Sequence, residues 1–206
     1  MKVPASDVAF TDAVKHQQLQ RGSRTAYARM EQGDGWQTTI TPELRAFLAE
    51  RDSVYLATAS SAGQPYVQHR GGPPGFVKVL DERTLAFADF EGNRQFITLG
   101  NLAENDRAFL FFMNYARRQR IKVWGRARVV EGDANLRDQL MPQADGERSQ
   151  RAIVFTVEAW DVNCPRHIPQ KIDAADVRAA LSRLEEQVRA LTEENAQLRA
   201  QLQARG

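Results

Sequence analysis

The sequence has few of the residues that form disulfides or metal sites. It contains one cysteine, Cys164, so no disulfide can form within the chain, and only three histidines. A single thiol is typical of a reducing compartment. Cys164 and His167 lie close together, but two ligands do not make a structural zinc site. We therefore expect no metal centre.

Long apolar runs and a strong charge of one sign are also missing. No segment approaches the roughly 20 apolar residues of a membrane helix. The formal charge is only +2, and the first ten residues include Asp7 without a continuous apolar stretch. We therefore expect a cytoplasmic protein whose partners include neither a membrane nor a nucleic acid. Its 206 residues, 42% of them hydrophobic, suit one domain with appendages.

Familiar motifs of catalysis and phosphate binding are absent too. The chain has no Gly-x-Ser-x-Gly elbow, so Ser–His–Asp catalysis has no support. Its glycine-rich segment from Gln68 to Asn105 is neither a Gly-x-Gly-x-x-Gly fingerprint nor a P-loop.

The N-terminal 40 residues are polar, and we interpret them as an arm with one helix around Asp12–Gln20. A clearer helix follows, because Thr41 can cap its start and Pro42 suits the first helical position. That helix should end near Arg51.

Short runs of strand-forming residues, separated by turn signals, fill most of the remaining chain. They predict a mainly β fold with some α, in the form of an antiparallel barrel. Phe111, Phe112 and Trp124 lie in apolar runs and are interpreted as core. The predicted strands are Ser53–Ser60, Pro65–Arg70, Phe76–Leu80, Thr84–Asp89, Arg107–Met113, Arg120–Val130 and Ala152–Val162, with helices from near Asn93 and over Ala134–Leu140.

The last 30 or so residues carry a heptad repeat. Leucine or valine occupies the d positions, and the a positions hold apolar residues and one asparagine. The pattern predicts a coiled-coil helix that reinforces a dimer formed elsewhere; a single amphipathic helix packed on its own domain is the alternative. The d residues are Val177, Leu184, Leu191 and Leu198, and the a residues are Leu181, Val188, Asn195 and Leu202. Glu194 and Arg199 form an attractive interchain pair.

Cationic residues mark one segment as a candidate cofactor site. Arg70 and Lys78 lie on strand-like runs that a hairpin could bring together, and Arg94 falls at a predicted helix start. A flavin mononucleotide needs cations and backbone N–H groups for its phosphate, and a positive charge near its ring. Taken singly, each of these residues would be an ordinary exposed cation.

Four blocks of sequence resemble the pyridoxamine 5'-phosphate oxidase-like family, over about Thr41 to Ile172. The resemblance implies an FMN-binding split barrel that forms a homodimer. It divides the chain into an arm (1–40), a barrel domain (41–172) and a coiled-coil helix (173–206). The blocks are Gln-His-Arg-Gly-Gly-Pro-Pro-Gly-Phe from Gln68, Ala-Phe-Ala-Asp-Phe-Glu-Gly-Asn-Arg-Gln from Ala86, Lys-Val-Trp-Gly-Arg-Ala from Lys122 and Trp-Asp-Val-Asn-Cys-Pro-Arg-His-Ile-Pro from Trp160.

The resemblance also implies roles for single residues. Lys78 would lie beside the flavin ring, which the strand end at Ala88 and Asp89 would approach. Arg94 and Gln95 stand where the family has a phosphate-binding cation pair, so Gln95 replaces a charge with a neutral amide. Arg70 joins these cofactor contacts. Arg120 of the partner subunit would supply a further cation, with Arg118 as the alternative.

The C-terminal block departs from the family pattern. True pyridoxamine phosphate oxidases follow a Trp with an Arg-x-His segment that grips the substrate. Here Trp160 and Arg166 keep their spacing, but Ile168 stands where the His would be. We therefore do not expect the pyridoxamine phosphate reaction. Asn163, Arg166 and His167 are the candidate substrate-facing residues.

Two functional hypotheses follow. The first is an FMN-dependent oxidoreductase acting on an unidentified small substrate, with NAD(P)H as a possible electron donor, no assigned acid–base residue and F420 as the alternative cofactor. The second is a non-catalytic flavin-binding redox sensor or carrier whose coiled coil recruits a partner. A leucine-zipper DNA-binding protein does not fit, because residues 166–176 contain only Arg166 and Lys171 as strong cations.

Overall fold

The computed structural model describes residues 3–33, 35–141, 149, 151–162 and 165–204, which belong to two units. The first unit is Met1–Asn114 with Gln119–Arg166, and the second is Tyr115–Arg118 with His167–Gly206. The elements are, in chain order, η1 (Ala5–Val8), α1 (Asp12–Gln20), α2 (Arg24–Gln32), α3 (Pro42–Ala49), β1 (Ser53–Ala59), β2 (Pro65–Gly71), β3 (Lys78–Val79), β4 (Thr84–Asp89), α4 (Ile97–Glu104), β5 (Arg107–Asn114), β6 (Gln119–Glu131), α5 (Ala134–Leu140), β7 (Arg151–Val162) and α6 (Ala174–Gln203).

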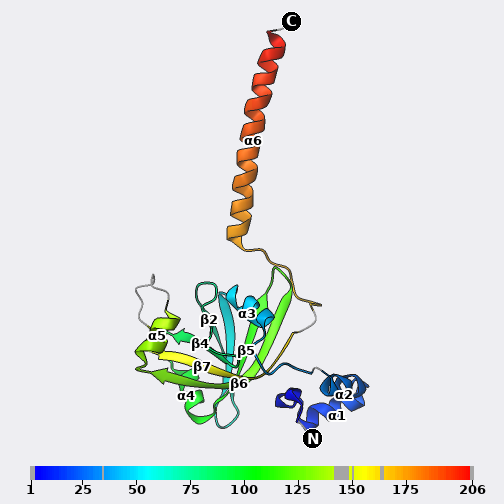
Figure 1. Ribbon diagram of the computed structural model, residues 1–206, viewed down its shortest axis with the longest axis vertical. Helices are drawn as coiled ribbons and strands as arrows, with labels where there is room; N and C mark the ends of the chain where they lie inside the picture. Colours follow the sequence, from blue (N-terminus) through cyan, green and yellow to red (C-terminus); the bar gives the residue numbers. More distant parts are fainter. Residues whose placement is uncertain (1–2, 34, 142–148, 150, 163–164, 205–206) are drawn as a thin grey trace. The chain divides into compact units, whose positions relative to one another are not determined.

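Within the described residues, seven strands form one antiparallel sheet in the order β2-β1-β5-β6-β7-β4-β3 (Figure 1). One face of this sheet carries the core. Leu56, Leu110 and Val123 lie in register across β1, β5 and β6, and all three are fully buried. Side chains alternate between the two faces of a strand, so this row defines the inner face. The antiparallel β fold with added helices is confirmed.

The sheet is curled. An ion pair joins Arg70 of β2 to Asp89 of β4 at 2.8 Å, although these strands are first and sixth in the sheet order. A flat sheet would hold such strands more than 20 Å apart, at roughly 4.8 Å per step. The two ends of the sheet therefore approach each other on its inner face.

A bulge bends β6 where it pairs with β7. The register shifts between Trp124 and Gly125. A Cβ atom on Gly125 would lie 2.0 Å from the carbonyl oxygen of Thr156, a distance that no side chain tolerates. Only glycine allows this close approach of the two strands.

The N-terminal 40 residues contain more structure than the sequence predicted. Helix α1 is confirmed, but α2 was missed because its short polar sequence buries no residue. Trp36 stacks on Trp124 of β6 with ring centroids 4.4 Å apart, and Lys122 Nζ lies 4.9 Å from the centroid of the Trp124 ring. These contacts hold the segment against the outer face of the sheet.

Several predicted elements agree closely with the structure. The start of α3 is confirmed, since the Thr41 hydroxyl accepts a hydrogen bond from the Leu44 N–H at 3.3 Å. Strand β4 and helix α5 have their predicted bounds.

Two predictions of local structure are wrong. A hairpin does not bring Arg70 and Lys78 together, because β2 pairs with β1 and the two-residue β3 pairs with β4. The helix expected from near Asn93 begins at Ile97 instead. Arg94 and Phe96 adopt left-handed φ angles of 59° and 54°, which interrupt any helix before that point.

The second unit contains α6 and the loops that precede it. Arg118 Nε donates a hydrogen bond to the Ile168 carbonyl at 3.0 Å, and Lys171 Nζ lies 4.4 Å from the Tyr115 ring centroid. The helix predicted for the tail is confirmed, with 30 residues. Among the described residues, no helix combines the length and hydropathy that a membrane crossing requires.

Candidate functional site

Three charged side chains, Arg70, Asp89 and Arg151, form a buried group that we call the arginine cluster. Their side chains are 16%, 1% and 8% exposed. Asp89 Oδ1 lies 2.8 Å from Arg70 Nη2, and Asp89 Oδ2 lies 3.3 Å from Arg151 Nε. One carboxylate therefore holds two guanidinium groups.

Strand alternation brings the cluster together. Arg70 lies in register with Val54, whose side chain is buried, so Arg70 faces the inside of the curled sheet. Asp89 shares its face of β4 with the core residue Phe87. Arg151 is the register partner of Asp89 on β7. Three strands that are not consecutive in the sequence thus direct charged side chains to one place.

The cluster has an excess of positive charge and unused hydrogen-bonding capacity. Arg70 Nε is buried, and none of the described residues accepts a hydrogen bond from it. The contact between Arg70 and Asp89 Oδ1 is short, but its angles are not those of a hydrogen bond. Buried polar atoms normally have partners. The donor set therefore fits an anionic ligand that carries several acceptor oxygens, such as a phosphate.

The cluster lines a cavity of about 30 Å³. This is the room of roughly one water molecule, so the cavity could take one oxygen of an anion while the rest of a ligand lay outside it. Most of the other lining side chains are polar, and Thr98 donates a hydrogen bond to Gln68 Oε1 at 2.9 Å. The cavity is lined by Tyr66, Gln68, Arg70, Asp89, Phe90, Glu91, Gly92, Asn93, Gln95, Phe96, Ile97, Thr98, Leu99 and Arg151.

The loop beside this cavity is strained. Arg94 and Phe96 both have positive φ angles, a conformation that costs a non-glycine residue on the order of 1 kcal/mol. The guanidinium of Arg151 lies 5.3 Å from the Phe96 ring centroid. Such strain is common in ligand-binding loops, because the surrounding contacts hold the backbone in place.

The structure divides the predicted cofactor residues into two groups. Arg70, Asp89 and Gln95 line the cavity. Lys78 does not, because it lies in register with Ala86. Ala86 and Ala88 share the face of β4 that packs against α5, and Asp89 points to the opposite face. The expected contact between Arg70 and Lys78 is therefore not found.

Arg94 is also outside the cavity lining. Its side chain is 70% exposed, and its Nε lies 3.6 Å from Glu91 Oε2. The prediction of a cation in the first turn of a helix is wrong, since α4 begins only at Ile97 and Arg94 itself has a left-handed φ angle. Gln95 N–H instead donates a hydrogen bond to Asn93 Oδ1 at 3.2 Å.

The remaining predicted residues are dispersed. Arg120 is half-buried on β6, and its Nε has no hydrogen-bond partner among the described residues. Arg166 is exposed, and His167, also exposed, belongs to the second unit. Asn163 and Cys164 lie outside the described residues. In the described part of the chain, no three His, Cys, Asp or Glu residues are arranged to hold a metal ion.

Sequence reasoning missed Arg151. It begins β7 and directly precedes an apolar run, which is a weak signal for any function. Its place in the cluster depends on the pairing of β7 with β4, and no local sequence pattern predicts that pairing. Gln68, Asn93 and Thr98 were not predicted as site residues either, although Gln68 and Asn93 lie in the blocks that carry the family resemblance.

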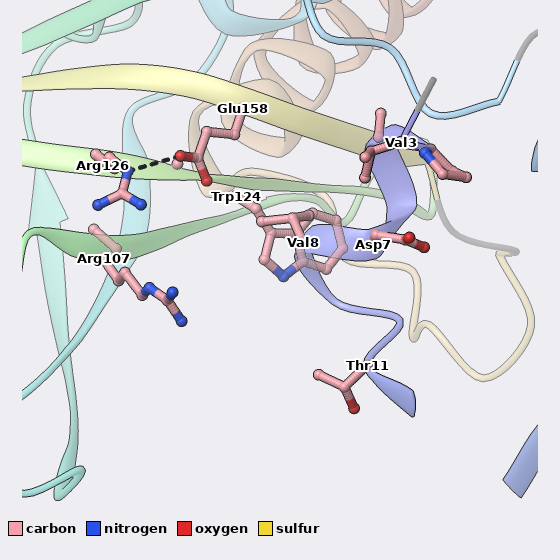
Figure 2. Close-up of a pocket in the computed structure, with 12 residues that line it drawn as sticks. Val3, Asp7, Val8, Thr11, Arg107, Trp124, Arg126 and Glu158 are labelled. Atoms are coloured by element: carbon pink, nitrogen blue, oxygen red, sulfur yellow. Dashed lines mark hydrogen bonds and ion pairs between the residues drawn. The ribbon is translucent and has the colours of Figure 1, made fainter. Parts of the chain in front are cut away.

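A larger cavity, of about 480 Å³, lies between η1 and the outer face of β5, β6 and β7 (Figure 2). Trp124 from β6 and Val8 from η1 are among the residues that line it. Arg126, at one side, is paired with Glu158 at 2.8 Å and with Asp106 at 2.7 Å. The hydrogen bond to Glu158, together with the charge of Asp106, raises the pKa of Arg126. Because two carboxylates already hold this cation, the smaller cavity is the better candidate for an anion.

Comparison with known structures finds similar chains at low identity. HupZ from Group A Streptococcus is 18% identical, with a TM-score of 0.49, over 65% of this chain and 99% of that one. A putative pyridoxamine 5'-phosphate oxidase from Lactobacillus delbrueckii is 21% identical, with a TM-score of 0.47, over 61% and 95%. HutZ, the heme storage protein from Vibrio cholerae, is 21% identical, with a TM-score of 0.42, over 60% and 94%.

These similarities are too low to argue for a shared ligand. No curated protein matches this chain. The profile of the family described as pyridoxamine 5'-phosphate oxidase matches residues 40–164, which is more than half of the 206 residues. The chain therefore belongs to the pyridoxamine 5'-phosphate oxidase family.

Proposed function

We propose that this protein binds FMN and carries out flavin-dependent oxidation or reduction of a small molecule. The observation that carries the proposal is the arginine cluster, in which two buried guanidinium groups share one carboxylate beside a polar, strained loop. Family membership supports the choice of a flavin. The phosphate of FMN is a dianion, and it matches the net positive charge of the cluster better than an uncharged ligand does.

The described residues suggest separate roles in binding the phosphate, the ring and the substrate. Arg70 and Gln95, with Asn93, would hold the phosphate end, and Arg94 could turn toward it from its exposed position. For Lys78 of β3 and Ala88 of β4, contact with the flavin ring stays a prediction, because Ala88 lies on the face of β4 that packs against α5. A bound flavin would supply hydride and electron transfer, while the protein would supply orientation and charge. For Asn163, Arg166 and His167, substrate contact stays a prediction.

We further propose that the curled sheet is a split barrel and that a second copy covers its outer face. Val67, Ala57, Phe109 and Trp124 lie in register across β2, β1, β5 and β6 on that face. Val67 is 59% exposed, although it belongs to this apolar row. Trp36 already covers the Trp124 end of the row, so the exposed end at Val67 is the part left for a second copy. A homodimer built on this face could also bring Arg120 of the partner subunit to the flavin.

The test is an FMN titration of the ligand-free, full-length protein, followed by quenching of flavin fluorescence. Arg70→Gln should weaken binding about 10- to 100-fold, because a charged hydrogen bond is worth about 1.5–3 kcal/mol. The matched control is Arg45→Gln, which changes an exposed arginine of α3 and should bind FMN as the wild type does. Urea denaturation shows whether each variant is folded. A folded Arg70→Gln protein with wild-type affinity would contradict the proposal.

Two further probes define the ligand and the activity. F420 and heme are titrated beside FMN, because F420 is the alternative cofactor and HutZ is a heme storage protein. Tighter binding of either one than of FMN would replace the cofactor assignment. Rapid reduction of the bound flavin by NADH or NADPH supports an oxidoreductase. Slow reduction by both would favour a carrier or sensor.

A further inference from the structure

Helix α6 presents an apolar seam that nothing in its own unit covers. None of its 30 residues is buried. The apolar seam residues are between 43% and 71% exposed, which is unusual for large aliphatic side chains on a folded protein. They are Val177, Leu181, Leu184, Val188, Leu191, Leu198 and Leu202. The rest of the helix surface is polar, so the seam is a binding surface for one partner helix.

A groove on this seam has the form of a coiled-coil hole. Val188, Leu191, Thr192 and Asn195 line it, together with Ala196 and Arg199. The first four occupy heptad positions a, d, e and the next a. In a parallel two-stranded coil, a side chain at d enters a hole formed by those four positions of the facing helix. The groove therefore has the lining that would receive Leu191 of a second copy.

Asn195 favours one direction and one register. In a parallel, in-register pair it faces Asn195 of the second copy, and the two amides can hydrogen-bond. If the two helices pair antiparallel, with residue 177 of one opposite residue 202 of the other, Asn195 lies opposite Leu184. A shift by one heptad puts it opposite Val188 or Leu202. Each of these alternatives leaves a buried amide without a partner, which costs about 1–3 kcal/mol.

Charges beside the seam are complementary to those of a second copy. Glu194 occupies a g position, and Arg199 occupies the e position five residues later. In a parallel pair, Glu194 of each chain faces Arg199 of the other, and two-fold symmetry forms the contact twice. The groove, the asparagine and this charge pair are all self-complementary. That property favours another copy of this chain over an unrelated partner.

We propose that α6 pairs with α6 of a second copy as a parallel, in-register, two-stranded coiled coil. Asn195 fixes its register, and Leu191 packs into the groove of the facing helix. The pair raises the effective concentration of the attached domains for each other, so the dimer resists dilution. This role does not depend on which ligand the protein binds.

Cysteine cross-linking of the full-length protein tests the direction of pairing. Cys164→Ser removes the native thiol, and Leu198→Cys adds one at a d position. In a parallel pair the two new thiols face each other; in an antiparallel overlay they are about 25 Å apart. Glu186→Cys, on the outer surface of the helix, is the control. We expect a disulfide-linked fraction about 10-fold higher for Leu198→Cys than for Glu186→Cys after equilibration in glutathione buffer.

Two outcomes would overturn the proposal. One is equal cross-linking of the two variants. The other is cross-linking of Leu198→Cys chains only with Leu181→Cys chains in a mixture, which is the antiparallel result.

Asn195→Leu tests the register. It should allow Leu191→Cys and Leu198→Cys chains to cross-link in a mixture, because a shift by one heptad no longer buries an unpaired amide. Gln197→Leu, at an outer position, should not. If Asn195→Leu leaves the cross-linking pattern unchanged, Asn195 does not set the register.

Discussion

The arginine cluster and helix α6 differ in how their parts are assembled. The cluster takes one residue from each of three strands, β2, β4 and β7, and leaves at most 16% of any of the three side chains exposed. Helix α6 is one continuous segment whose important side chains are exposed. The cluster therefore depends on the fold around it, whereas the seam of α6 exists as soon as the helix forms. This contrast gives different expectations for mutation in the two regions.

The largest expected effect is the loss of protein stability when the carboxylate of the cluster is removed. Asp89→Asn leaves Arg70 and Arg151 buried without a carboxylate, and breaking a buried ion pair costs about 3–5 kcal/mol. Asp106→Asn is the matched control, because it removes one carboxylate from the exposed Arg126 pair. An exposed pair contributes little to the free energy of unfolding, so Asp106→Asn should be the milder change. Urea denaturation measures the free energy of unfolding of both variants. Equal losses of this free energy would show that burial does not distinguish the two sites.

Removing α6 should affect association more than folding. Deletion of residues 174–206 is expected to leave a dimer by light scattering, since the proposed interface of the sheet remains. Its dissociation constant should rise about 100-fold, because the coil no longer adds to the effective concentration. Sedimentation over a range of dilutions measures this change. A truncated protein that is monomeric at every concentration would make the coil the main contact and remove support for the sheet interface.

A smaller effect is expected where this chain departs from its family. Gln95 lines the cavity and stands where the family resemblance implies a cation. Gln95→Lys should tighten FMN binding about 10-fold, the gain of roughly one charge-assisted hydrogen bond. Gln64→Lys, in the exposed turn between β1 and β2, is the control for added charge. Equal affinity of the two variants would place the phosphate elsewhere.

The contrast between the two regions also explains what the sequence could predict. The α6 helix and its seam follow from a repeat that is visible in a single segment, and strand β4 follows from apolar runs between turn residues. Arg151 could not be found in this way, because its role depends on the pairing of β7 with β4. The error about Arg70 and Lys78 has the same origin: adjacent strands in sequence were assumed to be adjacent in the sheet.

Two other errors concern the backbone conformation before α4 and the face of the sheet on which aromatic residues lie. The left-handed residues Arg94 and Phe96 delay α4, although neither is a glycine that would signal such a turn. Phe112 is buried as expected, but Phe111 and Trp124 are only half-buried on the outer face. Apolar composition identified these strands, and alternation placed the two half-buried rings on the side proposed for a second copy.

The most direct test of the proposed cofactor is the ligand that the purified protein carries. We predict a yellow protein with the absorbance bands of an oxidised flavin, and release of FMN on denaturation, identified by mass spectrometry. A colourless protein that also fails to bind added FMN would contradict the proposal that this chain is a flavoprotein.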